Sequence, residues 1–591
     1  MAYLHILVTF GILHIASTSD CDVEFVYSDY FNSNGFKVTC KDIEEGQENI
    51  IRSIAAHNAL ILLIRNASLA NITSNIFENV PKIKELSIED SEILINGQVD
   101  PFSKLELLQK LNLKNTKLMQ IGNGTFKNLL QLKFLHLENN SVNMMSKDSL
   151  KSSSLEIFEF ISNELDDIED IPLCDIPNIR VINFKKNKLK YLRPDLYQCS
   201  VPIESVRRKE SYEDNHYNVE TIDLSDNEIS SLDGAFKSFK NLEHLHLENN
   251  LIGRITDTDF EKTNEMSYLN LSNNSISSIS SAAFGTLYKL KQLDLSRNKI
   301  AKIKLEFLSG LSEVYLAHNE LTFESINSIN RLPHLEILDL SFNKLKGTSK
   351  IFSNFPSLVT LNLEGNNLIL ENDMFTNLTQ LEKLSLSNNG IIHIPDLIFN
   401  RTTSLVELNL SNNKLESLDY NDVFSSLTNL QILDLSRNNL MSLSYLLFVK
   451  LDNVETLDIA GNKLKTLDYS LIITNMRALS TVNIKDNYFS CNFLHRVVKY
   501  FSWKGINYRA DNITHYDEEN IGGINCKEDV FPEAYNTVQV SPSTKSNSVF
   551  IIILVSAVFS VFVLLLIVIF KYYQFHRRRK YQCDQFELIE D

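Results

Sequence analysis

Cysteine is the residue type in this chain whose spacing most directly suggests covalent chemistry. Cys21 and Cys40 enclose a short hairpin-like segment that turns at Asn34-Gly35, and Cys491 and Cys526 enclose a segment with apolar residues at helical spacing. Disulfides between such pairs are typical of small caps in secreted proteins. We predict three disulfides, Cys21–Cys40, Cys174–Cys199 and Cys491–Cys526, which leave the seventh cysteine, Cys583, as a free thiol.

Histidines and carboxylates offer a second kind of chemistry, namely metal binding or acid–base catalysis. His244 and His246 share one face of an expected strand, and Asp223 lies on the neighbouring strand. Two imidazoles without a third close ligand do not complete a zinc site. The sequence contains no H-E-x-x-H, no G-x-S-x-G, no phosphate-binding glycine loop and no cysteine–histidine signature. We therefore predict that the chain is not an enzyme and holds no metal and no cofactor.

Asparagine recurs at one position of a repeated frame, L-x-x-L-x-L-x-x-N, whose positions are numbered 1 to 9 below. The interval between successive units is 21 to 25 residues, with one longer gap. A fixed period in this range indicates a solenoid whose units bury their apolar faces against each other. The ninth-position asparagines are Asn140, Asn163, Asn187, Asn227, Asn250, Asn274, Asn298, Asn319, Asn343, Asn366, Asn389, Asn413, Asn438, Asn462 and Asn487.

Each unit must place a short strand before this asparagine. Leu433 and Leu435 alternate with polar residues, which is the period of a strand with one buried face. The amide of Asn438 can then satisfy backbone groups where the chain leaves the strand. Three weaker units precede the column, so we expect an α/β solenoid of about 18 repeats over residues 59–490. The frame resembles that of the leucine-rich repeat, so we expect a horseshoe with a concave parallel β-sheet and disulfide caps. Cys174 and Cys199 lie one repeat apart, at nearly equivalent places in successive repeats.

Both ends of the chain carry signals for a membrane protein. Residues 6–15 are apolar and small residues follow, as in a secretory signal, and residues 549–570 contain no charge over a bilayer-spanning length. Basic residues follow at once, so we expect a single-pass type I protein of the plasma membrane with its ectodomain outside. The expected organisation is signal peptide 1–19, N-terminal cap 20–58, repeat array 59–490 with an insertion at 200–218, C-terminal cap 491–527, stalk 528–548, transmembrane helix 549–570 and cytoplasmic tail 571–591.

Glycosylation and sorting signals agree with this route. In the tail, Asp584, Leu588 and Ile589 fit an acidic-dileucine sorting signal, although a short acidic-apolar end also arises by chance. Asn270 and Asn409 fall on the expected concave sheet, where sugars would block part of the surface. The ten N-x-S/T sites are Asn66, Asn71, Asn123, Asn139, Asn270, Asn273, Asn377, Asn400, Asn409 and Asn512.

Residues at positions 3 and 5 of the frame point outward from the concave strands. Phe134, Ile157 and Val181 occupy position 3 of three consecutive units, so they form a candidate ligand-binding patch. Simple β-preference of these residue types is the alternative explanation. Position 5 carries a discontinuous acidic column, which is either a solvated face or an attraction for a basic partner. The net charge of −17 argues against nucleic-acid binding.

A long cysteine-bracketed unit carries the most specific resemblance. The sequence LCDIPNIRVINFKKNKLKYLRPDLYQCS, then a polar excursion, then VETIDLSDNEISSL, resembles the long repeat in ectodomains of insect Toll-family receptors. The repeat frame also resembles insect leucine-rich repeat immune proteins and neuronal adhesion ectodomains. The Toll-family cytoplasmic signalling domain is missing after residue 571, and the C-terminal cap has two cysteines where that family usually has four.

The resemblance implies a protein that captures a ligand or partner. We expect a cell-surface recognition receptor or co-receptor for protein or microbial ligands, acting in innate immunity and signalling only through partners. The alternatives are a homophilic or heterophilic adhesion molecule, or an endocytic decoy. A non-covalent dimer or a co-receptor complex is compatible with the sequence, because all six extracellular cysteines find partners within the chain.

Overall fold

The computed structural model describes most of the part of the chain that carries the repeats. It covers residues 21–527 except 53–58, 70–71, 96–99, 152–153, 169–170, 172, 195, 197–217, 328, 330–331, 419–421 and 509–519. These residues belong to one compact unit, residues 1–529. Among its described helices, none combines the length and apolar composition needed to cross a bilayer. The predicted signal peptide, nearly all of the insertion, the stalk, the segment 549–570 and the tail with Asp584, Leu588 and Ile589 lie outside the described residues, as do Asn71, Asn512, Cys199 and the side chain of Cys174.

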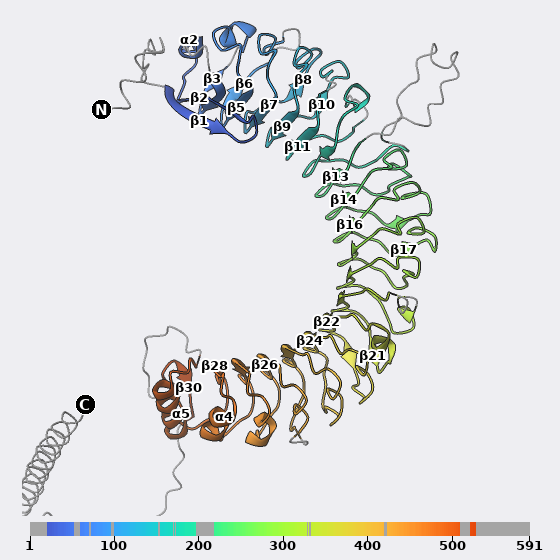
Figure 1. Cartoon of the computed structure of the whole chain (residues 1–591), viewed down its shortest axis with the longest axis vertical. Coiled ribbons are helices and arrows are strands. Elements are labelled where there is room, and N and C mark those ends of the chain that lie inside the picture. Colours follow the sequence, from blue (N-terminus) through green and yellow to red (C-terminus); the bar gives the residue numbers. More distant parts are fainter. Residues whose placement is uncertain are drawn as a thin grey trace, which may run out of the picture. The chain divides into compact units, whose positions relative to one another are not determined.

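One 20-stranded sheet lines the inner side of an arc (Figure 1). It begins with the antiparallel hairpin of β1 (Cys21–Ser28) and β2 (Ser33–Lys41), and β2 then pairs in parallel with β3 (Ala59–Arg65). Every later pair in this sheet is parallel and joins successive repeats. The remaining strands are β5 (Glu85–Glu89), β7 (Lys110–Lys114), β9 (Phe134–Glu138), β11 (Ile157–Ile161), β12 (Val181–Asn183), β13 (Thr221–Asp223), β14 (His244–His246), β16 (Tyr268–Asn270), β18 (Gln292–Asp294), β19 (Glu313–Tyr315), β20 (Ile337–Asp339), β22 (Thr360–Asn362), β24 (Lys383–Ser385), β25 (Glu407–Asn409), β26 (Ile432–Asp434), β27 (Thr456–Asp458) and β28 (Thr481–Asn483).

The predicted solenoid with a parallel sheet is confirmed. Strands β3 to β28 of the described sheet enclose about 17 turns, in agreement with the expected 18 repeats because each turn joins two strands. Leucines at positions 4 and 6 are buried in every clear repeat, as Leu433 and Leu435 show. Phenylalanines from the returning segments stack behind them, with ring centroids of Phe102 and Phe126 5.8 Å apart. The core is therefore one continuous apolar column between the sheet and the outer side.

The ninth-position asparagines join neighbouring turns as expected. Asn438 is buried and its Nδ2 donates to the carbonyls of Leu410, Leu435 and Ser436 at 3.0–3.2 Å, while its Oδ1 accepts from the Leu415 N–H at 3.1 Å. The same pattern recurs along the array. Each asparagine thus satisfies backbone groups that the strand ladder leaves unpaired, and such groups are costly when buried alone.

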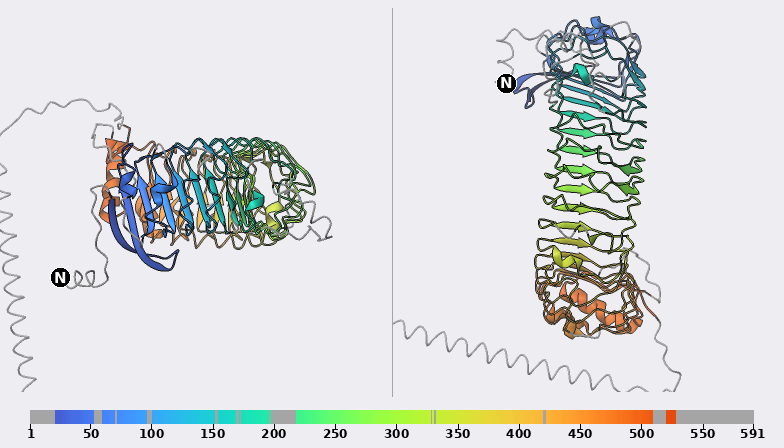
Figure 2. Two further views of the ribbon diagram at one scale, coloured as in Figure 1. Left: turned by 90° about the horizontal axis from the view of Figure 1, so that it is seen from above. Right: turned by 90° about the vertical axis from the view of Figure 1, so that its right-hand side faces the viewer.

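The outer side of the array contains less helix than an α/β description implies. Within the described residues it consists of turns, two-stranded ribbons, short 3-10 helices and the seven-residue helix α4 (Tyr469–Asn475) (Figure 2). The ribbons are β4 (Ser68–Leu69) with β6 (Glu92–Ile93), β8 (Gln120–Ile121) with β10 (Met144–Met145), β15 (Arg254–Ile255) with β17 (Ser278–Ile279) and β21 (Lys346–Gly347) with β23 (Asn367–Leu368). The 3-10 helices are η1 (Ser74–Phe77), η2 (Leu173–Asp175), η5 (Ile351–Asn354) and η6 (Tyr445–Phe448), and the α-helices are α2 (Asn49–Arg52), α4 (Tyr469–Asn475) and α5 (Cys491–Lys504).

Disulfide-linked caps close both ends of the apolar column. Cys21 pairs with Cys40 inside the first hairpin, and Cys491 at the start of α5 pairs with Cys526 beyond the small hairpin of β29 (Asn520–Ile521) and β30 (Ile524–Asn525). Both bonds are those expected from the sequence. The caps protect terminal repeats that would otherwise expose their core.

Candidate functional site

The apolar row on the concave face is continuous across three strands. Phe134 of β9 lies directly beside Ile157 of β11, and Ile157 lies beside Val181 of β12. All three side chains are half-buried. The Phe134 ring is held between two neighbours: the Lys110 Nζ is 5.4 Å from the ring centroid, and the His136 ring stacks at 6.0 Å with an interplanar angle of 15°. The structure therefore brings together the three residues that the frame predicted as neighbours.

Paired charges flank this row at position 2 of the repeat. Lys133 forms an ion pair with Glu156 at 3.3 Å, and Arg180 forms one with Glu220 at 2.7 Å. Both pairs are exposed to solvent, so each contributes little to stability. They do, however, neutralise the charges beside the row. On this flank the surface therefore offers apolar contact, and its paired charges leave no net charge that would attract an ionic ligand.

A histidine–carboxylate cluster flanks the row at positions 5 and 7. His136 Nδ1 lies 2.7 Å from Glu159 and its Nε2 lies 3.0 Å from Glu138, which also pairs with Lys114 at 2.8 Å. A neutral imidazole has only one N–H, so hydrogen bonds from both ring nitrogens to carboxylates require the imidazolium form. The frame positions predict that His136 and Glu159 are neighbours, but the hydrogen bonds of this cluster depend on side-chain rotamers, for which the sequence carries no signal.

The electrostatics of the cluster favour its charged form. Burial alone lowers the pKa of His136, but its hydrogen bonds to Glu159 and Glu138 outweigh burial and raise that pKa above its usual value. Burial likewise raises the pKa of Glu138, while hydrogen bonds from Lys114 and His136 outweigh it and lower that pKa. The cluster is therefore a charge-balanced network beside the apolar row.

The histidine pair on β14, His244 and His246, has aromatic and carboxylate neighbours, and His246 Nδ1 lies 3.8 Å from Glu248. Tyr268 of the next strand covers the His246 ring at 4.8 Å, and burial lowers the pKa of His246. Asp223 uses its Oδ1 to accept the Ser225 N–H at 2.9 Å. In the described part of the chain no group of three or more histidine, cysteine or acidic side chains is arranged to hold a metal ion.

The acidic column at position 5 proves to be part of the backbone architecture. The Oδ1 atoms of Asp294 and Asp434 each accept a backbone N–H two residues later, at 2.8 Å. Burial raises the pKa of both carboxyls, although these hydrogen bonds oppose the rise. Asp223, Asp339 and Asp458 make the same contact. These carboxylates thus accept hydrogen bonds from the turn that follows each strand. This role in the backbone explains the acidic column better than attraction of a basic partner does.

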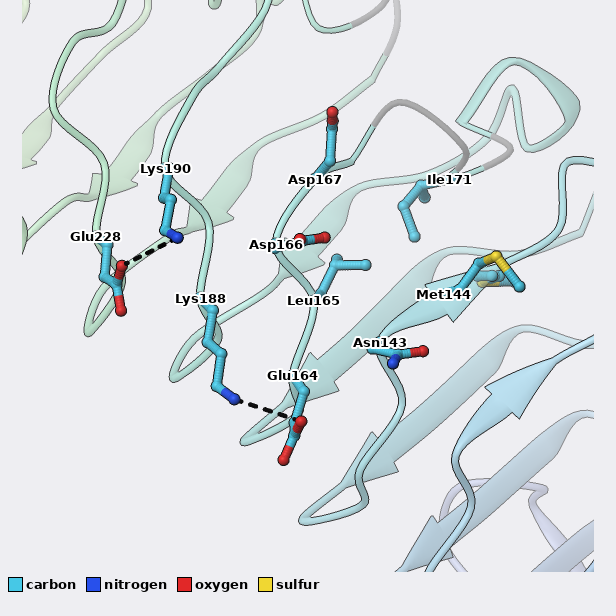
Figure 3. A pocket seen from close by; sticks show the side chains of 11 residues that line it. Asn143, Met144, Glu164, Leu165, Asp166, Asp167, Ile171, Lys188, Lys190 and Glu228 are labelled. Atoms are coloured by element: carbon cyan, nitrogen blue, oxygen red, sulfur yellow. Dashed lines mark ion pairs between the residues drawn. The ribbon is translucent and has the colours of Figure 1, made fainter.

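A shallow pocket of about 590 Å³ opens at the flank of the array beside the long repeat (Figure 3). Four of its charged side chains are paired across neighbouring turns: Lys188 lies 3.3 Å from Glu164, and Lys190 lies 3.9 Å from Glu228. Met144 and Ile171 supply apolar surface. The only sequence signal for this pocket is the alternation of acidic and basic residues directly after the ninth-position asparagine, at Glu164, Lys188 and Glu228. Nothing in it resembles a catalytic arrangement.

Most candidate glycosylation sites that the structure describes are accessible. Asn66, Asn123, Asn139, Asn273, Asn377 and Asn400 are exposed. Asn270 and Asn409 are half-buried on the concave strands, and each Oδ1 accepts the N–H of the serine two residues later. These two side chains have the same backbone role as the aspartates of the acidic column.

Comparison with known proteins identifies the repeat. The chain matches the family described as leucine rich repeat at residues 240–300, 264–321, 309–368, 379–440 and 403–464. It also matches the two-copy leucine rich repeats at 217–261 and the BspA type leucine rich repeat region at 58–142 and 99–214. These matches together take in most of the array.

Among curated proteins, the chain is 26% identical to human podocan-like protein 1 over 266 residues, which is 44% of this chain and 40% of the relative. It is 28% identical to mouse podocan over 216 residues, which is 36% of this chain and 31% of the relative. The chain therefore matches well under half the length of these relatives.

Two solved structures are among those that match the chain in part. The ectodomain of the plant membrane receptor kinase GASSHO1/SCHENGEN3 from Arabidopsis thaliana, solved with CASPARIAN STRIP INTEGRITY FACTOR 2, covers 78% of this chain and 55% of its own at 21% identity and a TM-score of 0.46. The TLR13–ssRNA13 complex covers 80% of this chain and 94% of its own at 18% identity and a TM-score of 0.32. The family matches agree with the asparagine ladder and the parallel sheet of the structure. The chain therefore belongs to the leucine-rich repeat proteins.

Proposed function

We propose that this chain is a cell-surface recognition protein that binds an extracellular protein ligand on the concave face of its array, at Phe134, Ile157 and Val181. The observation that carries the proposal is the unbroken apolar row across β9, β11 and β12. Adjacent apolar side chains that are partly exposed, as these three are, favour a contact site more than isolated ones do. Ion pairs neutralise the charges at position 2 beside the row, so the surface suits apolar side chains of a protein more than an ionic ligand.

The proposed location is the outer face of the plasma membrane, with residues 549–570 as a single anchor. The apolar, uncharged composition of that segment and the basic residues after it support a type I orientation. The disulfides of both caps support an oxidising compartment. A receptor or co-receptor role in innate immunity is the finer form of the proposal, and its support is the resemblance of the long repeat to insect Toll-family ectodomains.

The test is capture of extracellular proteins by the soluble ectodomain, residues 20–545, with quantitative mass spectrometry. The variant Phe134→Asp with Val181→Asp places charge in the apolar row. Because truncating a central contact residue commonly costs more than about 1.4 kcal/mol of binding, we expect capture of the ligand to fall at least about tenfold. Equal secretion of variant and wild type shows that the fold is intact.

A matched control changes the same frame position elsewhere. Ile337 and Ile432 also occupy position 3, but each lies between polar neighbours in the adjacent strands. The variant Ile337→Asp with Ile432→Asp is expected to capture the ligand normally. If no captured protein distinguishes the two double variants, the proposed site is wrong. If the ligand is a second copy of this chain, the protein is a homophilic adhesion molecule.

A further inference from the structure

The helix of the C-terminal cap, α5, has two opposite faces. It begins after Ser490, whose Oγ accepts the Phe493 N–H at 3.3 Å, and it ends at Gly505, which has a φ of 72°. Leu494, Val497 and Phe501 form its buried stripe and close the apolar column of the array. The face opposite this stripe therefore points away from the last repeat.

That outer face carries basic and aromatic side chains. Residues 492, 496, 499 and 503 are spaced by four, three and four positions, so they fall on one line of the helix. They are Asn492, Arg496, Lys499 and Trp503, and all four are exposed. Trp503 is the only tryptophan of the chain and is 73% exposed. Because this large aromatic ring is exposed on the outer face of α5, it does not help to bury the core of the cap.

The charge of α5 contrasts with the rest of the molecule. The helix contains Arg496, Lys499, Lys504 and His495 but no acidic residue, in a chain of net charge −17. On the sheet, basic residues commonly pair with acidic ones of the next repeat, as in the Lys110–Glu85 contact at 3.1 Å. Arg496 and Lys499 have no acidic side chain within ion-pair distance among the described residues.

Aromatic rings and amines also meet at the end of the helix. The Lys504 Nζ lies 4.6 Å from the Trp503 ring centroid, and the Tyr500 ring lies 5.7 Å from that of Trp503. Nearby, Lys527 places its Nζ 3.8 Å from the centroid of Tyr488. Exposed tryptophan and tyrosine rings together with amines are the side chains that anchor proteins at a membrane–water interface.

We propose that the outer face of α5 docks on a phospholipid bilayer, namely the one in which the segment 549–570 is embedded. This inference rests on the membrane anchor of the proposed function. The stalk 528–548 has 21 residues and spans at most about 70 Å when extended, so it allows the cap to reach the membrane surface. Docking would hold the last repeat against the bilayer and fix how the concave face is presented. An anionic polysaccharide would use the basic residues but leave no role for the exposed indole.

The sole tryptophan permits a direct test with the full-length chain in phospholipid vesicles. One set of vesicles is phosphatidylcholine and a second set contains phosphatidylserine as well. Flotation of the chain with the vesicles tests the anchor. Quenching of Trp503 fluorescence by brominated lipids, together with protection from acrylamide, tests docking. We expect both signals, and stronger docking in the vesicles that contain phosphatidylserine.

Charge reversal on the outer face supplies the decisive variant. Because each basic residue near an anionic surface contributes about 1 kcal/mol, Arg496→Glu with Lys499→Glu should lower the ratio of docked to undocked chain at least about tenfold. The control, Lys302→Glu with Lys304→Glu, makes the same charge change at exposed array positions remote from α5 and should quench like wild type.

Each result has a distinct meaning. A chain that floats but whose Trp503 is not quenched overturns docking and leaves the anchor intact. Quenching that survives charge reversal of Arg496 and Lys499 overturns the assigned face. A chain that does not float refutes the anchor and the docking that rests on it. Protection of Trp503 by heparin without quenching by lipid replaces the membrane with a polysaccharide.

Discussion

The asparagine ladder makes a sharp prediction at Asn438. This side chain is 6% exposed and makes four hydrogen bonds, two to Leu410 and Leu415 of the preceding repeat and two within its own repeat. Asn438→Ala leaves the Leu415 N–H and at least two carbonyls without their partner. Unsatisfied buried groups cost about 1–3 kcal/mol each, and carbonyls lie at the low end, so we expect a loss of about 3–5 kcal/mol.

Asn438→Asp separates the donor role from the acceptor role of the amide. The carboxylate can still accept the Leu415 N–H, but it faces the carbonyls of Leu410 and Leu435, to which it cannot donate. We therefore expect Asp to destabilise more than Ala near pH 7, even though Asp is closer to Asn in shape. The buried carboxyl has a folded-state pKa above its unfolded value, so the Asp variant regains stability as the pH falls and the carboxyl binds a proton.

Urea denaturation of the ectodomain measures the total loss, and hydrogen exchange of the Leu415 amide measures it locally. The local readout is needed because repeats of a solenoid interact only with their neighbours and the array need not unfold in one step. Asn439→Ala is the matched control, since the Asn439 side chain is only half-buried and lies beside the ladder. We expect it to change stability by less than about 0.5 kcal/mol. If Asn438→Asp is as stable as Asn438→Ala near pH 7, donation to carbonyls is not the function of the ladder.

Three further predictions concern the caps, the cluster and the backbone. Replacing Cys491 and Cys526 by serine removes a disulfide that spans 35 residues, and it should lower the free energy of unfolding of the C-terminal cap by about 3–4 kcal/mol. Hydrogen exchange of residues 491–527 at increasing urea concentrations measures this loss. Hydrogen bonds to Glu159 and Glu138 raise the pKa of His136 despite its burial, so its stabilisation relative to His136→Gln is complete from about pH 6.5 down to about pH 5, above the range in which carboxylates bind protons. The stabilisation is lost as the pH rises through the folded-state value. Denaturation between about pH 5 and about pH 9 checks this, and a loss on going from about pH 8 to about pH 6 would contradict it. Gly365→Ala should lower the free energy of unfolding by about 2–4 kcal/mol, because φ is +67° and the new methyl group meets the Phe342 ring. Gly390→Ala, where φ is +71° but the space is open, should lower it by about 1 kcal/mol. Equal shifts in melting temperature for the two variants would show that the clash with Phe342 has no effect.

The sequence was sufficient for the repeat, because the leucine frame fixes both the strands and their register. The neighbours Phe134, Ile157 and Val181 follow directly from counting positions along three units, and β9, β11 and β12 pair in that register. The cap disulfides followed from their places outside the array. These features depend on patterns that recur along one chain, so a single sequence carries them.

Position 8 shows what the sequence could not reveal. In all 18 described repeats the residue before the ninth position has a φ between about +50° and +67°. Asparagine, aspartate and glycine commonly adopt this left-handed region, but here Lys186, Arg297, His318 and Phe342 adopt it as well. These four residue types do not by themselves indicate a positive φ, so packing of the ladder against the previous repeat must impose the conformation. Long-range packing overrides residue preference at this position.

Strand length along the array shows where the concave face is available for recognition. From β12 onward the strands have three residues, and an Asp or Asn at position 5 usually accepts the N–H of position 7, as Asn183 and Asp294 do. This contact takes the position-7 amide out of the ladder and commits the position-5 side chain to the backbone. The sheet strands β5, β7, β9 and β11 have five residues each and lack that contact. There His136 and Glu159 are free to bond each other across the sheet beside the Phe134 row. Because four successive strands of this part of the array have side chains at positions 5 and 7 that are not needed to end a strand, specificity for a ligand is best encoded there.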